Sequence, residues 1–260
     1  MPAEPFKAVA RLLRACQPRY DLYTLFSDCM ETMAIAISNS VDLRQRETRE
    51  ARYLEIVGRY ERPVIETFAK VLGEVILALE AEPGDVLGQL FNELELGNPA
   101  RGQFFTPYPV SAAMAEMTLG NGDDARALIE QHGFVSAMEP ACGAGGMVIA
   151  LAQAMQRQGL NYQRHLHVTA IDIDPRAVHM AYIQFSLLHV PAVLIVGDSL
   201  SLEVRQSWHT PAHILGGWNA RLATRQADTP ALSRTMATMS APPTSLAEQY
   251  VGKPIQLSLF

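Results

Sequence analysis

The chain has 260 residues, of which 48% are hydrophobic and 18% are charged, and its formal net charge is −6. This length suffices for one large domain or two small ones, and the composition excludes a collagen-like or wholly disordered chain. The acidic balance argues against a protein that coats nucleic acid by charge alone.

No segment has the features of a targeting or membrane sequence. The N-terminus lacks the apolar stretch of a secretory signal, and the longest apolar runs are far too short to span a bilayer. The cysteines, Cys16, Cys29 and Cys142, are widely spaced and form no Cys-x-x-Cys pair. We therefore expect a cytoplasmic protein with no disulfide framework, no metal site and no membrane partner.

Residues 1–100 are expected to form a helical N-terminal region. In residues 21–38 apolar side chains recur at spacings of three and four, which predicts one buried helix face. Residues 42–62 mix arginines with acidic residues, and we interpret them as a solvated helix, the alternative being a face that contacts phosphates. Pro63 can open the next helix, and Pro83-Gly84 closes it.

The next region, residues 101–221, reads as alternating strands and helices. Phe134–Met138, His167–Ile171 and Ala192–Val196 are the candidate strands, and helices are expected after the first two. Such alternation implies a parallel sheet with right-handed crossovers. The predicted fold class is therefore α/β, preceded by a helical region.

A glycine-rich turn, Glu139–Gly146, lies between the first expected strand and the helix that follows it. Glycines there let the backbone turn sharply and approach a ligand closely. The helix after the turn directs free N–H groups and its positive dipole end at that ligand. The turn alone is weak evidence, because many nucleotide sites have one.

Acidic residues follow the next two strands. Asp172 can accept hydrogen bonds from both hydroxyls of a ribose, and Asp174 would cap the helix that Pro175 begins. Alternatively, both aspartates only start that helix. Asp198, after the third strand, either accepts from an adenine amino group or closes a turn. Three successive strand ends with suitable residues favour an adenosyl-ligand site over an empty scaffold.

These motifs resemble a known family. Glu139–Gly146, Asp172–Pro175 and Gly197–Leu200 are similar to the cofactor motifs of class I S-adenosylmethionine (SAM) methyltransferases. Gly102–Pro107, which reads GQFFTP, resembles the N-terminal motif of the N6-adenine DNA methylases. That family includes the modification subunits of type I restriction-modification systems.

The resemblance covers roughly residues 85–200 and implies a partial Rossmann-like SAM-methyltransferase domain over 101–221. It also implies S-adenosylmethionine as cofactor and DNA as a partner. In the family, the Thr-Pro element closes over the methionine end of the cofactor. The positions that the motifs assign to cofactor binding are Thr106, Glu139, Pro140, Ala141, Gly143, Gly145, Asp172, Ile173, Asp198 and Ser199.

The catalytic tetrapeptide of the family, Asn/Asp-Pro-Pro-Phe/Tyr/Trp, is not found after Asp198. In the family it orients the exocyclic amine of a flipped adenine, and its aromatic ring stacks on the base. We weigh Trp208–His213 as a divergent catalytic loop and prefer to interpret it as a packed or docking segment. No catalytic residue is therefore assigned.

The sheet is also expected to be incomplete, because Ala212–Leu215 is the one further strand candidate. Three possibilities stay open. The protein is a SAM-binding relative without catalysis, or it needs a partner chain to complete the sheet and supply DNA specificity, or it methylates through an unusual site.

Residues 222–255 are rich in Ala, Thr, Ser, Pro, Met and Gln and are expected to be a flexible tail. The last five, QLSLF, expose apolar side chains for which a free tail offers no burial. They resemble the bacterial sliding-clamp-binding peptide at every position. The resemblance implies the clamp, the β subunit of the replicative polymerase, as a partner of Gln256, Leu257, Leu259 and Phe260. The alternative is a strand that packs on the protein's own core.

Two functions are consistent with these patterns. The first is a SAM-dependent methyltransferase that acts on adenine N6 in DNA. The second is a catalytically inactive, methylase-like binding module that the sliding clamp recruits to replicating DNA.

Overall fold

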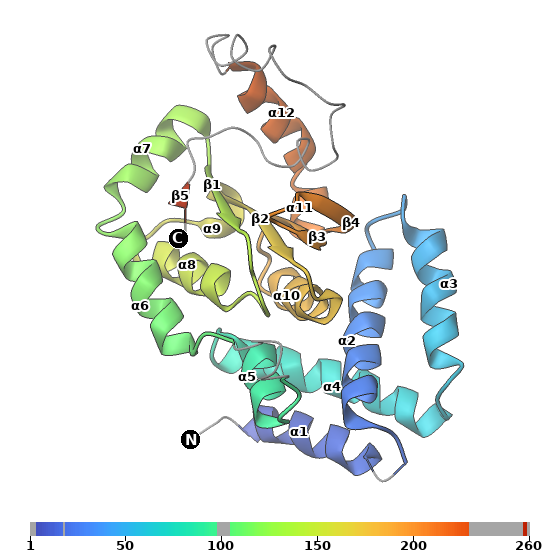
Figure 1. Cartoon of the computed structure of the whole chain (residues 1–260). Coiled ribbons are helices and arrows are strands. Elements are labelled where there is room, and N and C mark those ends of the chain that lie inside the picture. Colours follow the sequence, from blue (N-terminus) through green and yellow to red (C-terminus); the bar gives the residue numbers. More distant parts are fainter. Residues whose placement is uncertain (1–3, 18, 98–104, 229–256, 259–260) are drawn as a thin grey trace.

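The computed structural model describes residues 4–17, 19–97, 105–228 and 257–258, and Figure 1 shows their arrangement. Helices come first along the chain, and strands that alternate with helices follow. This order confirms the predicted α/β class with a helical N-terminal region. Within the described residues, no helix combines the length and the apolar character that crossing a bilayer requires.

The described residues of the N-terminal region form five helices. The side chain of Asp21 accepts the backbone N–H of Thr24 at 2.8 Å and so caps the second helix, whose apolar face is buried. Pro63 lies in the first turn of the fourth helix, as predicted. The helices are α1 (Glu4–Cys16), α2 (Leu22–Asn39), α3 (Arg46–Val57), α4 (Arg62–Ala81) and α5 (Val86–Glu93).

The arginine-rich helix α3 agrees with the solvated-helix interpretation except at one position. Arg52 pairs with Glu31 and Glu55 at the surface. Arg49 is instead buried, where its guanidinium pairs with Asp42 at 2.9 Å and stacks over the ring of Trp208 at 4.0 Å. Through Arg49 the helical region is attached to the far strand of the sheet.

The sheet has the order β4-β3-β2-β1-β5. Three of its strands are parallel and confirm the predicted ones, namely β1 (Val135–Glu139), β2 (Leu166–Asp172) and β3 (Ala192–Asp198), and β5 adds a fourth parallel strand. β4 (Glu203–His209) runs antiparallel to β3 and was not predicted. β5 (Leu257–Ser258) pairs parallel to Ala137 and Met138 on the outer edge of β1.

The predicted strand at Ala212–Leu215 is wrong, because this segment forms the helix α11 (Pro211–Leu215). Thr210 caps that helix by accepting the backbone N–H of His213 at 3.3 Å, and Pro211 occupies its first turn. Thr-Pro is a helix-start signal that outweighs the apolar run after it.

Helices cover the sheet and join it to the N-terminal region (Figure 1). α10 packs against β3 on one side and against α2 on the other, so the larger of the two buried cores runs through both parts. The helices of the α/β part, with α11, are α6 (Tyr108–Leu119), α7 (Asp123–His132), α8 (Gly146–Arg157), α9 (Tyr162–His165), α10 (Pro175–Leu187) and α12 (Trp218–Asp228).

Several predicted features lie outside the described residues. These are Gly102–Phe104 of the GQFFTP motif, most of the predicted tail, and Gln256, Leu259 and Phe260. α12 extends into the beginning of the segment predicted as a tail. The pairing of Leu257 and Ser258 with β1 corresponds to the alternative in which the C-terminus packs on the protein's own sheet.

Candidate cofactor site

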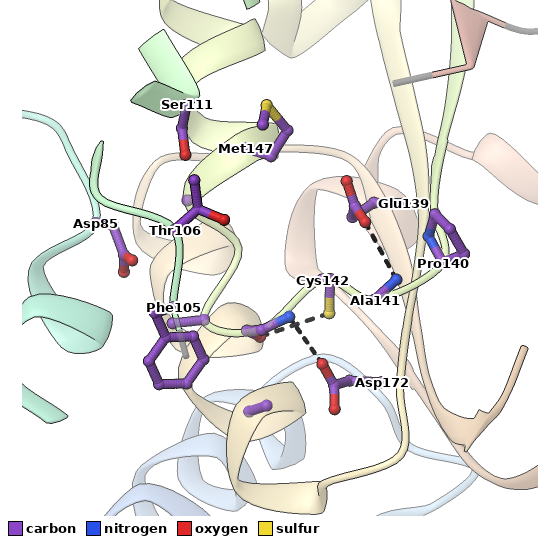
Figure 2. A pocket seen from close by; sticks show the side chains of 14 residues that line it. Asp85, Phe105, Thr106, Ser111, Glu139, Pro140, Ala141, Cys142, Met147 and Asp172 are labelled. Carbon is purple, nitrogen blue, oxygen red and sulfur yellow. Dashed lines mark hydrogen bonds between the residues drawn. The ribbon is translucent and has the colours of Figure 1, made fainter. Parts of the chain in front are cut away.

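A cavity of about 490 Å³ opens at the carboxyl ends of β1 and β2. Its volume falls within the range of about 300–1,000 Å³ that is usual for small-ligand pockets. The glycine turn forms its floor, Asp172 one wall, and Thr106 and Ser111 the opposite wall, as Figure 2 shows. The ends of two parallel strands and a glycine turn are therefore brought together as the sequence predicts.

The conformation of the turn explains its glycines. Gly143 and Gly145 have φ of +53° and +92°, which L side chains rarely adopt. A Cβ on Gly143 would lie 2.8 Å from Cδ1 of Phe105, and one on Gly145 would collide with the ring of Phe185. Both positions thus require glycine, Gly143 to admit the Phe105 wall and Gly145 to let α10 approach.

Asp172 holds the turn and lines the cavity. Its Oδ2 accepts the backbone N–H of Gly143 at 2.8 Å, and its Oδ1 accepts that of Asp174 at 2.9 Å. Burial raises the pKa of this carboxyl, although these hydrogen bonds act in the opposite direction. Asp174 caps α10 by accepting the backbone N–H of Arg176 at 3.0 Å, as predicted.

Two further carboxylates face the cavity, and both are 3% exposed. Glu139, at the end of β1, accepts the backbone N–H of Ala141 at 3.1 Å through Oε1, whereas its buried Oε2 has no hydrogen-bond partner. Asp85, just before α5, accepts the backbone N–H of Gly88 at 2.8 Å through Oδ1. Burial raises the pKa of each of these two carboxyl groups.

Sequence reasoning missed Asp85. Its local signal is that of a helix cap after Pro83-Gly84, which gives no sign of a ligand site. Its place in the cavity depends on contacts with α10, far along the chain.

The charged side chains among the described residues that line the cavity are all acidic. Asp85, Glu139 and Asp172 line it, and among the described residues that line it there is no Lys, Arg or His. Such a site disfavours phosphate groups and favours a ligand that carries positive charge. SAM fits these demands, because it has a sulfonium, an α-ammonium and a ribose diol, and the orphaned Glu139 Oε2 calls for a donor.

The predicted cofactor residues separate into two groups. Those that line the cavity are Thr106, Glu139, Pro140, Ala141, Gly143 and Asp172. Gly145 shapes the turn behind them, and Ile173 is 57% exposed beyond Asp172. Asp198 closes the turn after β3, because its Oδ1 accepts the backbone N–H groups of Leu200 and Ser201 at 2.8 and 3.3 Å. Ser199 belongs to the same turn.

The segment Trp208–His213 lies toward the amino ends of the parallel strands, away from the cavity. His209 pairs with Val193 at the beginning of β3, whereas the cavity lies where β1 and β2 end. Trp208 is 4% exposed, beneath Arg49. The preferred interpretation as a packed segment agrees with this position, and the catalytic-loop alternative does not. In the part of the chain that the structure describes, no cluster of His, Cys, Asp or Glu is arranged to hold a metal ion.

Comparison with known proteins gives a family match over half of the chain. A model of the family described as N-6 DNA Methylase matches residues 84–214. No curated protein matches the chain.

Two solved structures are similar to the chain. One, from Listeria monocytogenes, is described as a class I S-adenosylmethionine-dependent methyltransferase, with 17% identity, a TM-score of 0.42, and coverage of 76% of this chain and 53% of that one. The other is a type I restriction-modification system methyltransferase subunit from Streptococcus thermophilus, with 14% identity, a TM-score of 0.36, and coverage of 74% and 57%. The chain thus spans little more than half the length of either structure.

Proposed function

Because the chain belongs to the N-6 DNA methylase family, whose cofactor is S-adenosylmethionine, we propose that it binds SAM in the cavity at the ends of β1 and β2 and takes part in methylating adenine N6 in DNA. The observation that carries the proposal is the acidic lining of this cavity, which includes the orphaned oxygen of Glu139. When bound, SAM supplies an electrophilic methyl group on sulfur.

The chain's own residues would hold the two ends of the nucleoside. We assign the ribose hydroxyls to Asp172, because its carboxylate ends β2 and lines the cavity. The adenine would extend past Ile173 toward Asp198 and Ser199, at the end of the neighbouring strand β3. Asp198 Oδ1 accepts two backbone N–H groups of the turn, and we assign the carboxylate of Asp198 to the adenine amino group.

The methionyl end would lie against the turn and the Thr-Pro element. Glycine at 143 and 145 lets the backbone of the turn, from Pro140 and Ala141 onward, approach this end of the ligand. The hydroxyl of Thr106 lines the same cavity from the opposite wall. Among the described residues that line the cavity, these contacts would orient the cofactor without a basic side chain.

Methyl transfer also needs groups that orient the adenine amine, and the family's tetrapeptide is absent from these residues. We infer that a partner chain supplies these groups and the DNA specificity. The second candidate is an inactive SAM-binding module. The sequence QLSLF favours its recruitment by the sliding clamp through Gln256, Leu257, Leu259 and Phe260.

Calorimetry with SAM tests the cofactor site. The Asp172→Ala variant should bind SAM about 10- to 100-fold more weakly, since it loses charged hydrogen bonds to the ribose. Asp124→Ala, which removes an exposed aspartate of α7, is the matched control and should bind normally. Absence of binding by the wild type would refute the proposal.

Transfer of a labelled methyl group to unmethylated DNA, with and without candidate partner subunits, separates the two functions. Incorporation that depends on a partner supports the methyltransferase. SAM binding without incorporation under either condition supports the inactive module.

A clamp-binding assay tests the C-terminal peptide. Replacing Leu257, Leu259 and Phe260 by alanine should abolish capture by the purified clamp, because these are the apolar anchors. Ser258→Ala is the control and should bind nearly as well as the wild type. Undiminished capture of the triple variant would refute the assignment.

A further inference from the structure

The strand β1 has the composition of an inner strand. Val135 and Ala137 are 1% and 3% exposed, and the one charged residue of the strand, Glu139, is buried at the cavity. β4, at the opposite edge of the sheet, is mostly polar, and its Glu203 and Arg205 are exposed. Exposed charges of this kind protect an edge strand from unwanted pairing. Because β1 has no such protection, we expect it to need a neighbour on its outer edge.

That neighbour is the C-terminal strand of the same chain. β5 pairs in parallel with β1, and Leu257 lies opposite Ala137. Ser258 lies opposite Met138. Without β5 the described sheet would end at β1. A ladder of two residues is short, since a strand usually has about five or six, so a second binder of the same segment can displace it from β1.

Both residues of β5 belong to the QLSLF sequence that is assigned to the sliding clamp. Leu257 is one of the apolar anchors of that peptide, and Ser258 lies between two anchors. Neighbouring strands are only about 4.8 Å apart, which leaves no space for a second protein between β5 and β1. A cleft of the clamp that takes up the anchors must enclose the segment. The segment can therefore lie against β1 or in the clamp, but not in both.

The preceding helix keeps this segment close to β1. α12 is attached near the beginning of β1, where Arg225 Nη1 donates to Ser136 Oγ at 2.6 Å. Arg221 Nη2 also donates to the backbone oxygen of Gly133 at 3.4 Å. The composition of residues 229–256, which connect α12 to β5, predicts a flexible tether. Such a tether holds its end at an effective concentration in the millimolar range, which favours the pairing with β1.

We propose that the outer edge of β1 and the sliding clamp compete for the C-terminal segment, so that the chain withholds its clamp-binding peptide while β5 is paired. This inference rests on the proposed recruitment by the clamp. Only molecules in which β5 is detached can bind the clamp, and the apparent affinity falls in proportion to their fraction. Capture by the clamp would in turn uncover the outer edge of β1, directly before Glu139 of the cavity.

Calorimetry with the purified clamp compares the full chain with a free peptide of residues 251–260. The peptide should bind about 3- to 10-fold more tightly than the full chain, because a short pairing with β1 is all that opposes binding. Equal affinities would mean that β1 does not withhold the segment and would overturn the inference.

A reversible crosslink tests whether the two contacts exclude each other. Met138 and Ser258 are opposite each other, and the spacing of neighbouring strands lies within the Cα–Cα range of a disulfide. The double variant Met138→Cys, Ser258→Cys should crosslink on oxidation, lose clamp affinity by about 10-fold or more, and regain it on reduction. Each single variant is a matched control and should bind the clamp equally under both conditions.

Unchanged clamp binding by the crosslinked protein would show that the two contacts coexist, and the competition would be wrong. Failure of the two cysteines to join on oxidation would mean that β5 does not lie against β1 in solution, which overturns the inference as well. Failure of both the full chain and the free peptide to bind the clamp would instead refute the proposed recruitment, on which the competition depends.

Discussion

The carboxylates at the carboxyl ends of the parallel strands and the histidines His167 and His213 at their amino ends differ in how their buried polar atoms are satisfied. At the amino ends, His167 Nε2 lies 2.9 Å from His213 Nδ1, and His213 Nε2 lies 3.0 Å from Asn219 Oδ1. At the carboxyl ends, the buried Oε2 of Glu139 has no hydrogen-bond partner, and among the described residues both hydrogen bonds to Asp85 end on its Oδ1. Because buried polar groups in folded proteins are normally paired, the unpartnered oxygen of Glu139 in the cavity favours a ligand, whereas the paired histidines indicate structure.

The histidines at the amino ends are consistent with a structural role. Burial lowers the pKa of His213 to about 4 and that of His167 well below its usual value, so both are neutral at neutral pH. Asn219 presents an acceptor to His213 Nε2, which leaves His213 Nδ1 to accept from His167. Neutral histidines that hydrogen-bond to each other and to Asn219 in this way have no proton to offer a substrate.

The largest expected effect is at the amino ends. Trp218 is 1% exposed and packs edge-on against Phe134, with ring centroids 5.1 Å apart. Trp218→Ala should lower the free energy of unfolding by about 3–5 kcal/mol, as is usual for truncation of a buried aromatic residue. Urea unfolding measures this, and Leu215→Ala, at a site 71% exposed, should change it little. Loss of SAM affinity in folded Trp218→Ala protein would contradict the division between the two ends.

A smaller effect is expected in the glycine turn, which lines the cavity at the carboxyl ends of β1 and β2. Gly145→Ala should cost about 1–3 kcal/mol of stability for the left-handed backbone, and more for the collision with Phe185. Gly159→Ala is the matched control, because Gly159 has φ of +73° and open space around it. Equal losses of stability in the two variants, by thermal unfolding, would mean that the approach of α10 does not depend on Gly145.

Local chemistry explains which parts of the fold could be predicted. The three parallel strands, the glycine turn and the Asp174 cap are each encoded within a few neighbouring residues, and the structure confirms them. The family match confirms the resemblance that the motifs carried, and with it the cofactor.

The missed features depend on distant contacts. β4 has few apolar residues and is largely solvent-exposed, so its strand character comes from pairing with β3 and from Trp208 beneath Arg49. α11 was misread because an apolar run is ambiguous without its Thr210 cap. Asp85 acquires its place in the cavity through Gln184 of α10, which no local pattern reveals.

The smallest expected effect is a pH dependence in which the two ends act in opposite directions. Burial raises the pKa of Asp85 in the folded protein. The carboxyl group of Asp85 therefore contributes fully to the free energy of unfolding below about pH 4, and this contribution is lost as the pH rises through the pKa of Asp85 in the folded protein. The histidines do the reverse: their lowered pKa values make stability fall as the pH drops below about 6.5.

Asp85→Asn should therefore gain stability relative to the wild type as the pH rises from about 4 to neutrality, because the buried charge no longer has to form. Urea unfolding of both proteins across this range, without ligand, measures the difference. Saturating SAM should reverse the ranking at neutral pH, since the ionised Asp85 of the wild type then has a cationic partner that the variant cannot engage. A difference that stays constant with pH would mean that Asp85 ionises as readily as an exposed carboxylate. Its oxygen would then be satisfied by water, and the contrast between the two ends would no longer point to a ligand at Asp85.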